Sequence, residues 1–92
     1  MAGVSIDLEY PLTIDGREVR QLNMRRPNVG DLRIAQEAAG ANVMLYELTL
    51  IQNLLELTSD QLQAMDAADY YAAQEVLRGF TTPGRKKSAP RR

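Results

Sequence analysis

The chain contains no cysteine and no histidine. Without cysteine it has neither a disulfide framework nor a thiolate metal site. Without histidine it lacks the side chain that most often serves as general base or metal ligand near neutral pH. Tryptophan is also absent, and the aromatic residues are four tyrosines and one phenylalanine. We therefore expect a protein that is not an enzyme and that uses no cofactor and no metal.

Long apolar runs are missing as well. No run reaches the ~18 residues that a membrane-spanning helix needs, and the first residues lack the charged and apolar regions of a signal peptide. We expect no membrane association and a cytoplasmic location. The 92 residues, of which 45% are hydrophobic, are enough for one small domain.

Charge is distributed unevenly along the chain. Residues 1–80 contain six arginines and all 12 acidic residues, whereas residues 81–92 contain five basic residues and no acidic one. Residues 81–92 also include two prolines, one glycine and a single apolar residue, Ala89. Such a composition cannot form a core. The sequence predicts one acidic domain over residues 1–80 and a disordered basic tail over residues 81–92.

An alternating pattern at the start predicts a β-hairpin. Every second residue from 4 to 14 is apolar, and the Asp15-Gly16 pair that follows is typical of a two-residue hairpin turn. The return strand runs to about Met24. The spacing between Val19 and Leu22 is three rather than two, which predicts a bulge or a change of register there.

Capping residues and helical periodicity predict the rest of the fold. Asn28 and Asp66 are good N-cap residues, and Thr58 with Gln61 fits a capping box. We predict helices over about 28–39, 42–57, 58–65 and 66–79. The fold class is therefore α+β, with an N-terminal β-hairpin packed on a bundle of three to four short helices.

The segment 42–57 carries more apolar surface than one helix face needs. One seam with heptad-like spacing consists of Met44, Leu48, Ile51 and Leu55. A second seam consists of Val43, Tyr46, Leu50, Leu54 and Leu57. We expect one of the two seams to close the core. We expect the other, which we take to be the Met44 seam, to contact another helix or subunit, so we expect a homo-oligomer. The alternative is that both seams are internal.

Glu47 points into the middle of the apolar arc of this helix. A buried carboxylate without a partner is costly. We expect Glu47 either to reach solvent or an arginine, or to make a polar contact inside an interface with a partner. The candidate partner-binding residues are therefore Met44, Glu47, Leu48, Ile51 and Leu55.

Other charged residues have simpler interpretations. Asp60, Asp66 and Asp69 are expected to cap helices and complement helix dipoles, and Arg25-Arg26 to form a solvated strand end. The basic tail resembles a phosphate-binding arm, but no aromatic residue is interleaved and the domain is acidic. Nucleic acid is therefore not the expected partner, although a small nucleic-acid-binding regulator that uses the tail stays an alternative function.

The order of these features resembles a known family, the small tail assembly chaperones of long-tailed bacteriophages, particularly the Mu-like group. The resemblance covers residues 6–80. In its first half it rests on Tyr10-Pro11-Leu12, Asp15-Gly16-Arg17-Glu18-Val19, Leu22, Arg25-Arg26-Pro27, Val29 and Asp31-Leu32. In its second half it rests on Leu57-Thr58, Asp60, Leu62, Met65-Asp66, Asp69-Tyr70 and Val76-Leu77.

The resemblance implies a function that the residues alone do not show. It implies a chaperone that binds the apolar helices of the tape measure protein and keeps them soluble until the tail tube assembles. It further implies action in the cytoplasm of the infected host, absence from the mature virion, and a longer, frameshifted form that recruits tail tube protein. No catalytic residues are implied. A minor structural subunit of the virion is a further alternative.

Overall fold

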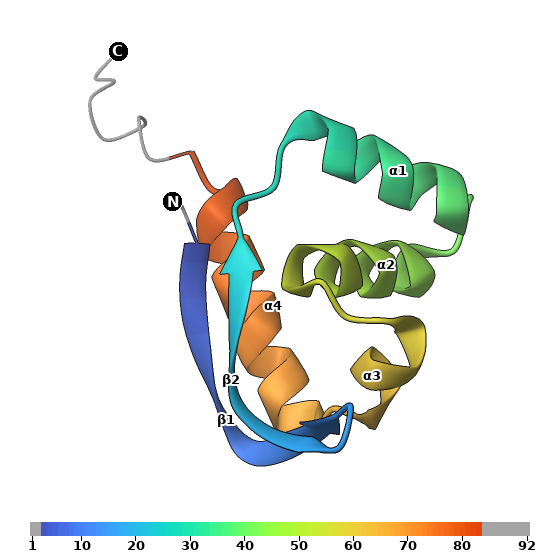
Figure 1. Ribbon diagram of the computed structural model, residues 1–92. Coiled ribbons are helices and arrows are strands. Elements are labelled where there is room, and N and C mark those ends of the chain that lie inside the picture. The colour runs from blue at the N-terminus through green and yellow to red at the C-terminus, as the bar shows by residue number, and fades with distance from the viewer. Residues whose placement is uncertain (1–2, 84–92) are drawn as a thin grey trace.

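The fold of the chain is that of the computed structural model in Figure 1, which describes residues 3–83. It is α+β, with an antiparallel hairpin followed by four helices, as predicted. The elements are β1 (Gly3–Ile14), β2 (Arg17–Arg25), α1 (Val29–Ala39), α2 (Val43–Leu55), α3 (Ser59–Ala64) and α4 (Ala67–Thr81). Helix α4 continues beyond Gly79, and the predicted disordered tail lies outside the described residues from position 84 onward.

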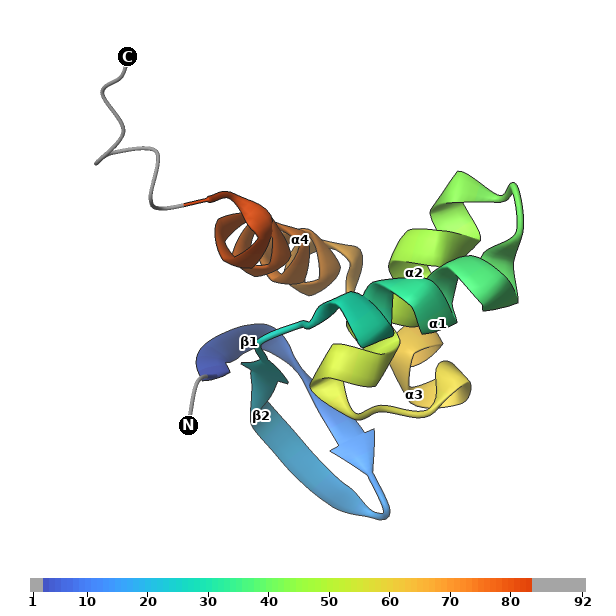
Figure 2. The ribbon, with the colours of Figure 1, turned by 90° about the horizontal axis from the view of Figure 1, so that it is seen from above.

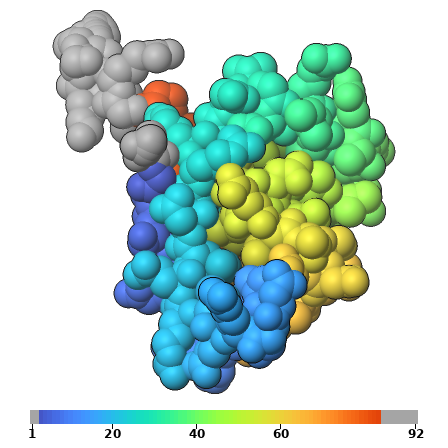
Figure 3. All heavy atoms as spheres, viewed as in Figure 1, coloured from blue at the N-terminus to red at the C-terminus, as the bar shows by residue number. Residues whose placement is uncertain are grey.

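Helix α4 runs along the hairpin, and α1, α2 and α3 stack together beside this pair (Figures 1 and 2). Figure 3 shows that the hairpin covers most of α4 on one face of the molecule. A hydrophobic cluster with members from both strands and all four helices forms the core. Its largest fully buried side chains are Met24, Ile51 and Leu54. Within residues 3–83, no helix has the length and apolar character needed to cross a membrane.

The hairpin has the predicted turn and a break in register. Asp15 and Gly16 both have positive φ angles, 53° and 79°, as this type of turn requires. Asp7 pairs with Gln21 and Leu12 pairs with Val19, so residues 8–11 of β1 lie opposite one residue of β2. The predicted change of register is confirmed, but the extra residues lie in β1 and not between Val19 and Leu22.

A physical reason places the extra residues in β1. Four residues of β1 lie opposite one residue of β2, so the pairing of the two strands shifts by three residues, which is an odd number. A strand shows the same face at every second residue, so an odd shift lets the even-numbered apolar residues of β1 face both Val19 and Leu22. Leu12 and Ile6, their partners, are both buried. The irregular segment also contains Pro11, which has no N–H to donate to a ladder.

Asp69 holds the irregular segment of β1 against α4. Its Oδ1 accepts a hydrogen bond from the backbone N–H of Glu9 at 2.9 Å, and its Oδ2 accepts one from that of Tyr10 at 3.0 Å. The side chain is buried. Asp69 lies in the first turn of its helix, as predicted. Its carboxylate also makes a tertiary contact that was not predicted, with strand amides 59 and 60 residues away in sequence.

The connection between β2 and α1 is fixed by an ion pair. The Arg25 guanidinium donates two hydrogen bonds, of 2.8 and 2.9 Å, to the Asp31 carboxylate. Asp31 completes a capping box with Asn28. The bonds from Arg25 and from the Asn28 backbone hold the pKa of Asp31 below its usual value, and the same pair raises the pKa of Arg25. The predicted strand end is thus only partly solvated: Arg25 ends β2 in an ion pair while its side chain stays 41% exposed. Arg26 is exposed, with its Cζ atom 5.3 Å from the ring centre of Phe80.

We predict that Asp69→Asn destabilises the protein. An amide has one acceptor oxygen, so one of the two strand amides loses its partner, which costs about 1–3 kcal/mol. The thermal midpoint should fall by about 4–8 °C for each kcal/mol in a domain of this size. The control is Asp66→Asn, which removes the same charge from the start of the same helix but keeps a good N-cap. Equal midpoints for the two variants would contradict the tertiary role of Asp69.

Candidate functional site

Helix α2 is divided along its length. Its C-terminal half carries Leu50, Ile51, Leu54 and Leu55, all of which are buried. Its N-terminal half begins with Val43 and Met44, whose exposed fractions are 81% and 71%. The C-terminal half lies beside β2 and α1 near the centre of the molecule, and the N-terminal half lies at the periphery (Figures 1 and 2). The apolar surplus seen in the sequence is thus concentrated at one end of the helix.

The predicted seams are not continuous faces in this structure. Of the candidate residues, Met44 is exposed, Glu47 and Leu48 are half-buried, and Ile51 and Leu55 are in the core. The division into an inner and an outer seam is corrected to a division into a buried half and an exposed half. A helical wheel assigns every turn the same surroundings, whereas the packing around α2 changes from one turn to the next.

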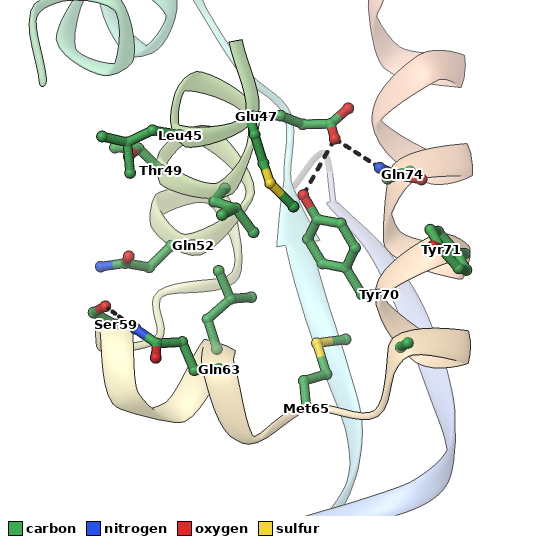
Figure 4. Close-up of a pocket in the computed structure, with 14 residues that line it drawn as sticks. Leu45, Glu47, Thr49, Gln52, Ser59, Gln63, Met65, Tyr70, Tyr71 and Gln74 are labelled. Carbon is green, nitrogen blue, oxygen red and sulfur yellow. Dashed lines mark hydrogen bonds between the residues drawn. The ribbon is translucent and has the colours of Figure 1, made fainter. Parts of the chain in front are cut away.

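Two hollows flank the exposed half of α2. The first, of about 500 Å³, lies between α2, α3 and α4 (Figure 4). Its apolar lining is Met44, Leu45, Leu48, Leu62, Met65, Ala67, Tyr70 and Tyr71. The second, of about 570 Å³, is lined by Val43, Met44, Tyr46, Glu47, Leu50 and Leu77. Because Met44 and Glu47 line both, we treat the two hollows and the exposed half of α2 as one surface, the α2–α4 face.

Glu47 forms a polar bridge across this face (Figure 4). Its Oε1 accepts a hydrogen bond from the Tyr70 hydroxyl at 3.2 Å and one from Gln74 Nε2 at 2.6 Å, which joins α2 to α4. Both donors are neutral. Glu47 is half-buried, so the expectation that it reaches solvent or an arginine is met through solvent; no arginine among residues 3–83 pairs with it. Burial and the negative charge of Glu47 raise the pKa of Tyr70 to about 12.

The sequence signal for this bridge was incomplete. The position of Glu47 within the apolar arc predicted contact with solvent or an arginine, or a polar contact inside an interface with a partner, and not a bridge to another helix of the same chain. Tyr70 was assigned to the apolar stripe of its helix, and Gln74 was not singled out. The two lie four residues apart, on one side of a helix, and this spacing is the only feature that could have paired them with a carboxylate.

The chemistry of the α2–α4 face is that of a binding surface. It offers apolar walls, several amide side chains and one carboxylate. Nowhere in residues 3–83 do three acidic side chains gather as metal ligands would. Apolar side chains left open beside such hollows are compatible with a protein–protein contact.

The chain is thus a small α+β domain with open apolar side chains on the α2–α4 face. A family model described as "Phage tail assembly chaperone proteins, E, or 41 or 14" matches residues 5–82. The chain therefore belongs to the phage tail assembly chaperone family, which confirms the resemblance seen in the sequence. This is not a family of enzymes. No curated protein and no solved structure gives a significant match to the chain.

We predict that one tyrosine of the folded protein ionises late, with a pKa of about 12. Because the folded pKa of Tyr70 lies above the unfolded value of about 10, its contribution to stability is complete below about pH 10 and is lost as the pH rises toward 12. An ultraviolet titration of tyrosinate absorbance measures this. Tyr70→Phe should remove the latest phase. Loss of an earlier phase, with the latest one kept, would contradict the assignment.

Proposed function

We propose that this chaperone binds the apolar helices of a phage tape measure protein and keeps them soluble until the tail tube assembles. The single observation that carries this proposal is the exposed apolar half of α2, flanked by two hollows on the α2–α4 face. Met44 and Leu48 contribute flexible or branched apolar surface at this face. Ile51 and Leu55 support it from the core.

Helix-in-groove binding explains why such a surface suits a chaperone. Burying apolar side chains of a partner helix is favourable by roughly 25 cal/mol per Å² of apolar area. Methionine adapts its shape to different partners, so one surface accepts helices of varied sequence. Residues 1–80 carry 12 acidic residues against six arginines, and this excess of one charge opposes aggregation of that part of the chain.

The proposal extends to location and to further partners. It places the protein in the cytoplasm of the infected host and leaves it out of the mature virion. A longer, frameshifted form would recruit tail tube protein. We also propose a homo-oligomer. The sheet has only the strands β1 and β2 in the part of the chain that the structure describes, so the outer edge of each strand has no neighbouring strand.

We predict that Met44→Gln abolishes client binding without unfolding the protein. The side chain is exposed, so an amide there is solvated, but it removes apolar contact from the α2–α4 face. The test co-expresses the variant with the tape measure protein and measures the soluble, co-purified fraction of that client. The matched control is Ile34→Gln, which removes an exposed apolar side chain from α1, away from this face.

A third variant separates core from surface. Ile51→Gln places an amide where no side-chain surface is exposed, and it should cost about 2–5 kcal/mol and abolish cooperative unfolding. If Met44→Gln and Ile34→Gln reduce the soluble client equally, binding is not localised to the α2–α4 face. If Met44→Gln leaves the client fully soluble and co-purified, the proposed site is wrong.

We predict self-association that is independent of Met44. Light scattering at ~0.15 M salt should give a mass above the 10.3 kDa of one chain, and Met44→Gln should leave that mass unchanged, because the contact is assigned to the hairpin. A monomer at every concentration from micromolar to millimolar would contradict the proposed oligomer and leave client binding unaffected.

A further inference from the structure

We propose that Glu47 is a specificity residue, which favours partner helices that carry a lysine or arginine beside their apolar stripe. This inference rests on the proposed function, because it names the chemistry of the partner that the α2–α4 face accepts. It concerns which helices the protein selects, whereas the proposed function concerns how bound helices are kept soluble. The apolar walls explain why helices bind, and the carboxylate decides which helices bind best.

The carboxylate has unused capacity to accept hydrogen bonds. Tyr70 and Gln74 both donate to Oε1, and no side chain or backbone group among residues 3–83 donates to Oε2 within hydrogen-bonding distance. An ionised carboxylate has about four acceptor sites. None of the ion pairs in the described part of the chain includes Glu47. Its charge is therefore held in place by neutral donors and is not neutralised.

The walls around Glu47 supply no basic residue. Between Arg33 and Arg78 the chain contains no lysine or arginine and seven acidic residues. This stretch includes α2, α3 and the part of α4 that lines both hollows. The acidic residues are Glu37, Glu47, Glu56, Asp60, Asp66, Asp69 and Glu75. The residues that line the two hollows supply no cation to Glu47, so charge complementarity favours a partner that carries one.

The dimensions of the face fit a helix. Along α4 the lining residues extend from Ala67 to Leu77, which is about 15 Å or three helical turns at 1.5 Å per residue. A partner helix of that length presents apolar residues at i, i+3 or i+4, and i+7 to the two hollows. Glu47 lies between the hollows, so a basic side chain flanking the stripe reaches Oε2 while its stem covers apolar surface.

Two other occupants fit less well. The chain's own basic segment, residues 84–92, contains one apolar residue, Ala89, so it has nothing with which to fill apolar hollows. A second copy that docked symmetrically would bring the same patch to itself, so that Glu47 would meet apolar walls and the Glu47 of the other copy, and no cation. A basic amphipathic helix of another protein satisfies both the apolar walls and the charge.

The test uses a conservative variant. Glu47→Gln keeps an oxygen that accepts from Tyr70 and Gln74 but removes the charge. The probes are overlapping peptides of about 25 residues that cover the tape measure protein encoded with this chain. For the tightest-binding peptide, each lysine and arginine is changed to glutamine in turn. The control protein is Glu37→Gln, which loses the same charge from α1 at an exposed site.

We expect Glu47→Gln to weaken binding of the tightest peptide about tenfold at low salt. One peptide substitution should have the same effect, and the combination should weaken binding no further. Glu37→Gln should change affinity less than twofold. High salt should shrink the difference between the wild type and Glu47→Gln.

The outcomes separate the two proposals. If no peptide binds the wild-type chain, the proposed function fails, and this inference fails with it. If peptides bind but Glu47→Gln matches the wild type, or no basic residue of the peptide couples to Glu47, the function stands and the specificity role is overturned. Tighter peptide binding by a chain ending at residue 83 would assign the site to the basic tail. Loss of self-association in Glu47→Gln alone would assign it to a second copy.

Discussion

The contact on which the architecture depends is the Asp69 carboxylate, which binds the Glu9 and Tyr10 amides of β1. It fixes α4 to the hairpin at the point where the register of the strands breaks. The next residue, Tyr70, connects α4 to a different element, because its hydroxyl donates a hydrogen bond to Glu47 of α2. Two consecutive side chains thus set the position of α4 between the hairpin and α2, and that position determines the width of the α2–α4 face.

The N-terminal half of α2 leaves apolar side chains exposed that no other element covers in the described part of the chain. A small domain has little apolar surface to spare, yet Val43 and Met44 stay open while the other half of the same helix builds the core. The polar bridge from Glu47 to Tyr70 and Gln74 holds α2 and α4 together across an apolar gap that their side chains do not fill. An apolar surface that stays open fits a member of a chaperone family, because such a surface is available to a partner.

Local signals predicted most of the fold. The turn at Asp15-Gly16 and the N-caps at Asn28, Thr58 and Asp66 were correct because each depends on residues within four positions of one another. Tertiary roles were not predictable in the same way. Asp69 is the first-turn residue that was predicted, but its bonds to the strand amides were not predictable because those amides are about 60 residues away in sequence. Ile51 looked like a surface residue because periodicity describes faces of a helix and not its ends.

The central claim is that a partner helix lies on the α2–α4 face, and the methyl groups of the methionines report on it most directly. Met44 and Met65 line this face, whereas Met24 is fully buried elsewhere in the core. With carbon-13 labels on the methionine methyl groups, a tape measure helix is titrated into the protein and the NMR spectrum followed. The account predicts that the Met44 and Met65 signals shift together and that the Met24 signal stays in place. A complex that forms while the Met44 and Met65 signals do not move would contradict it.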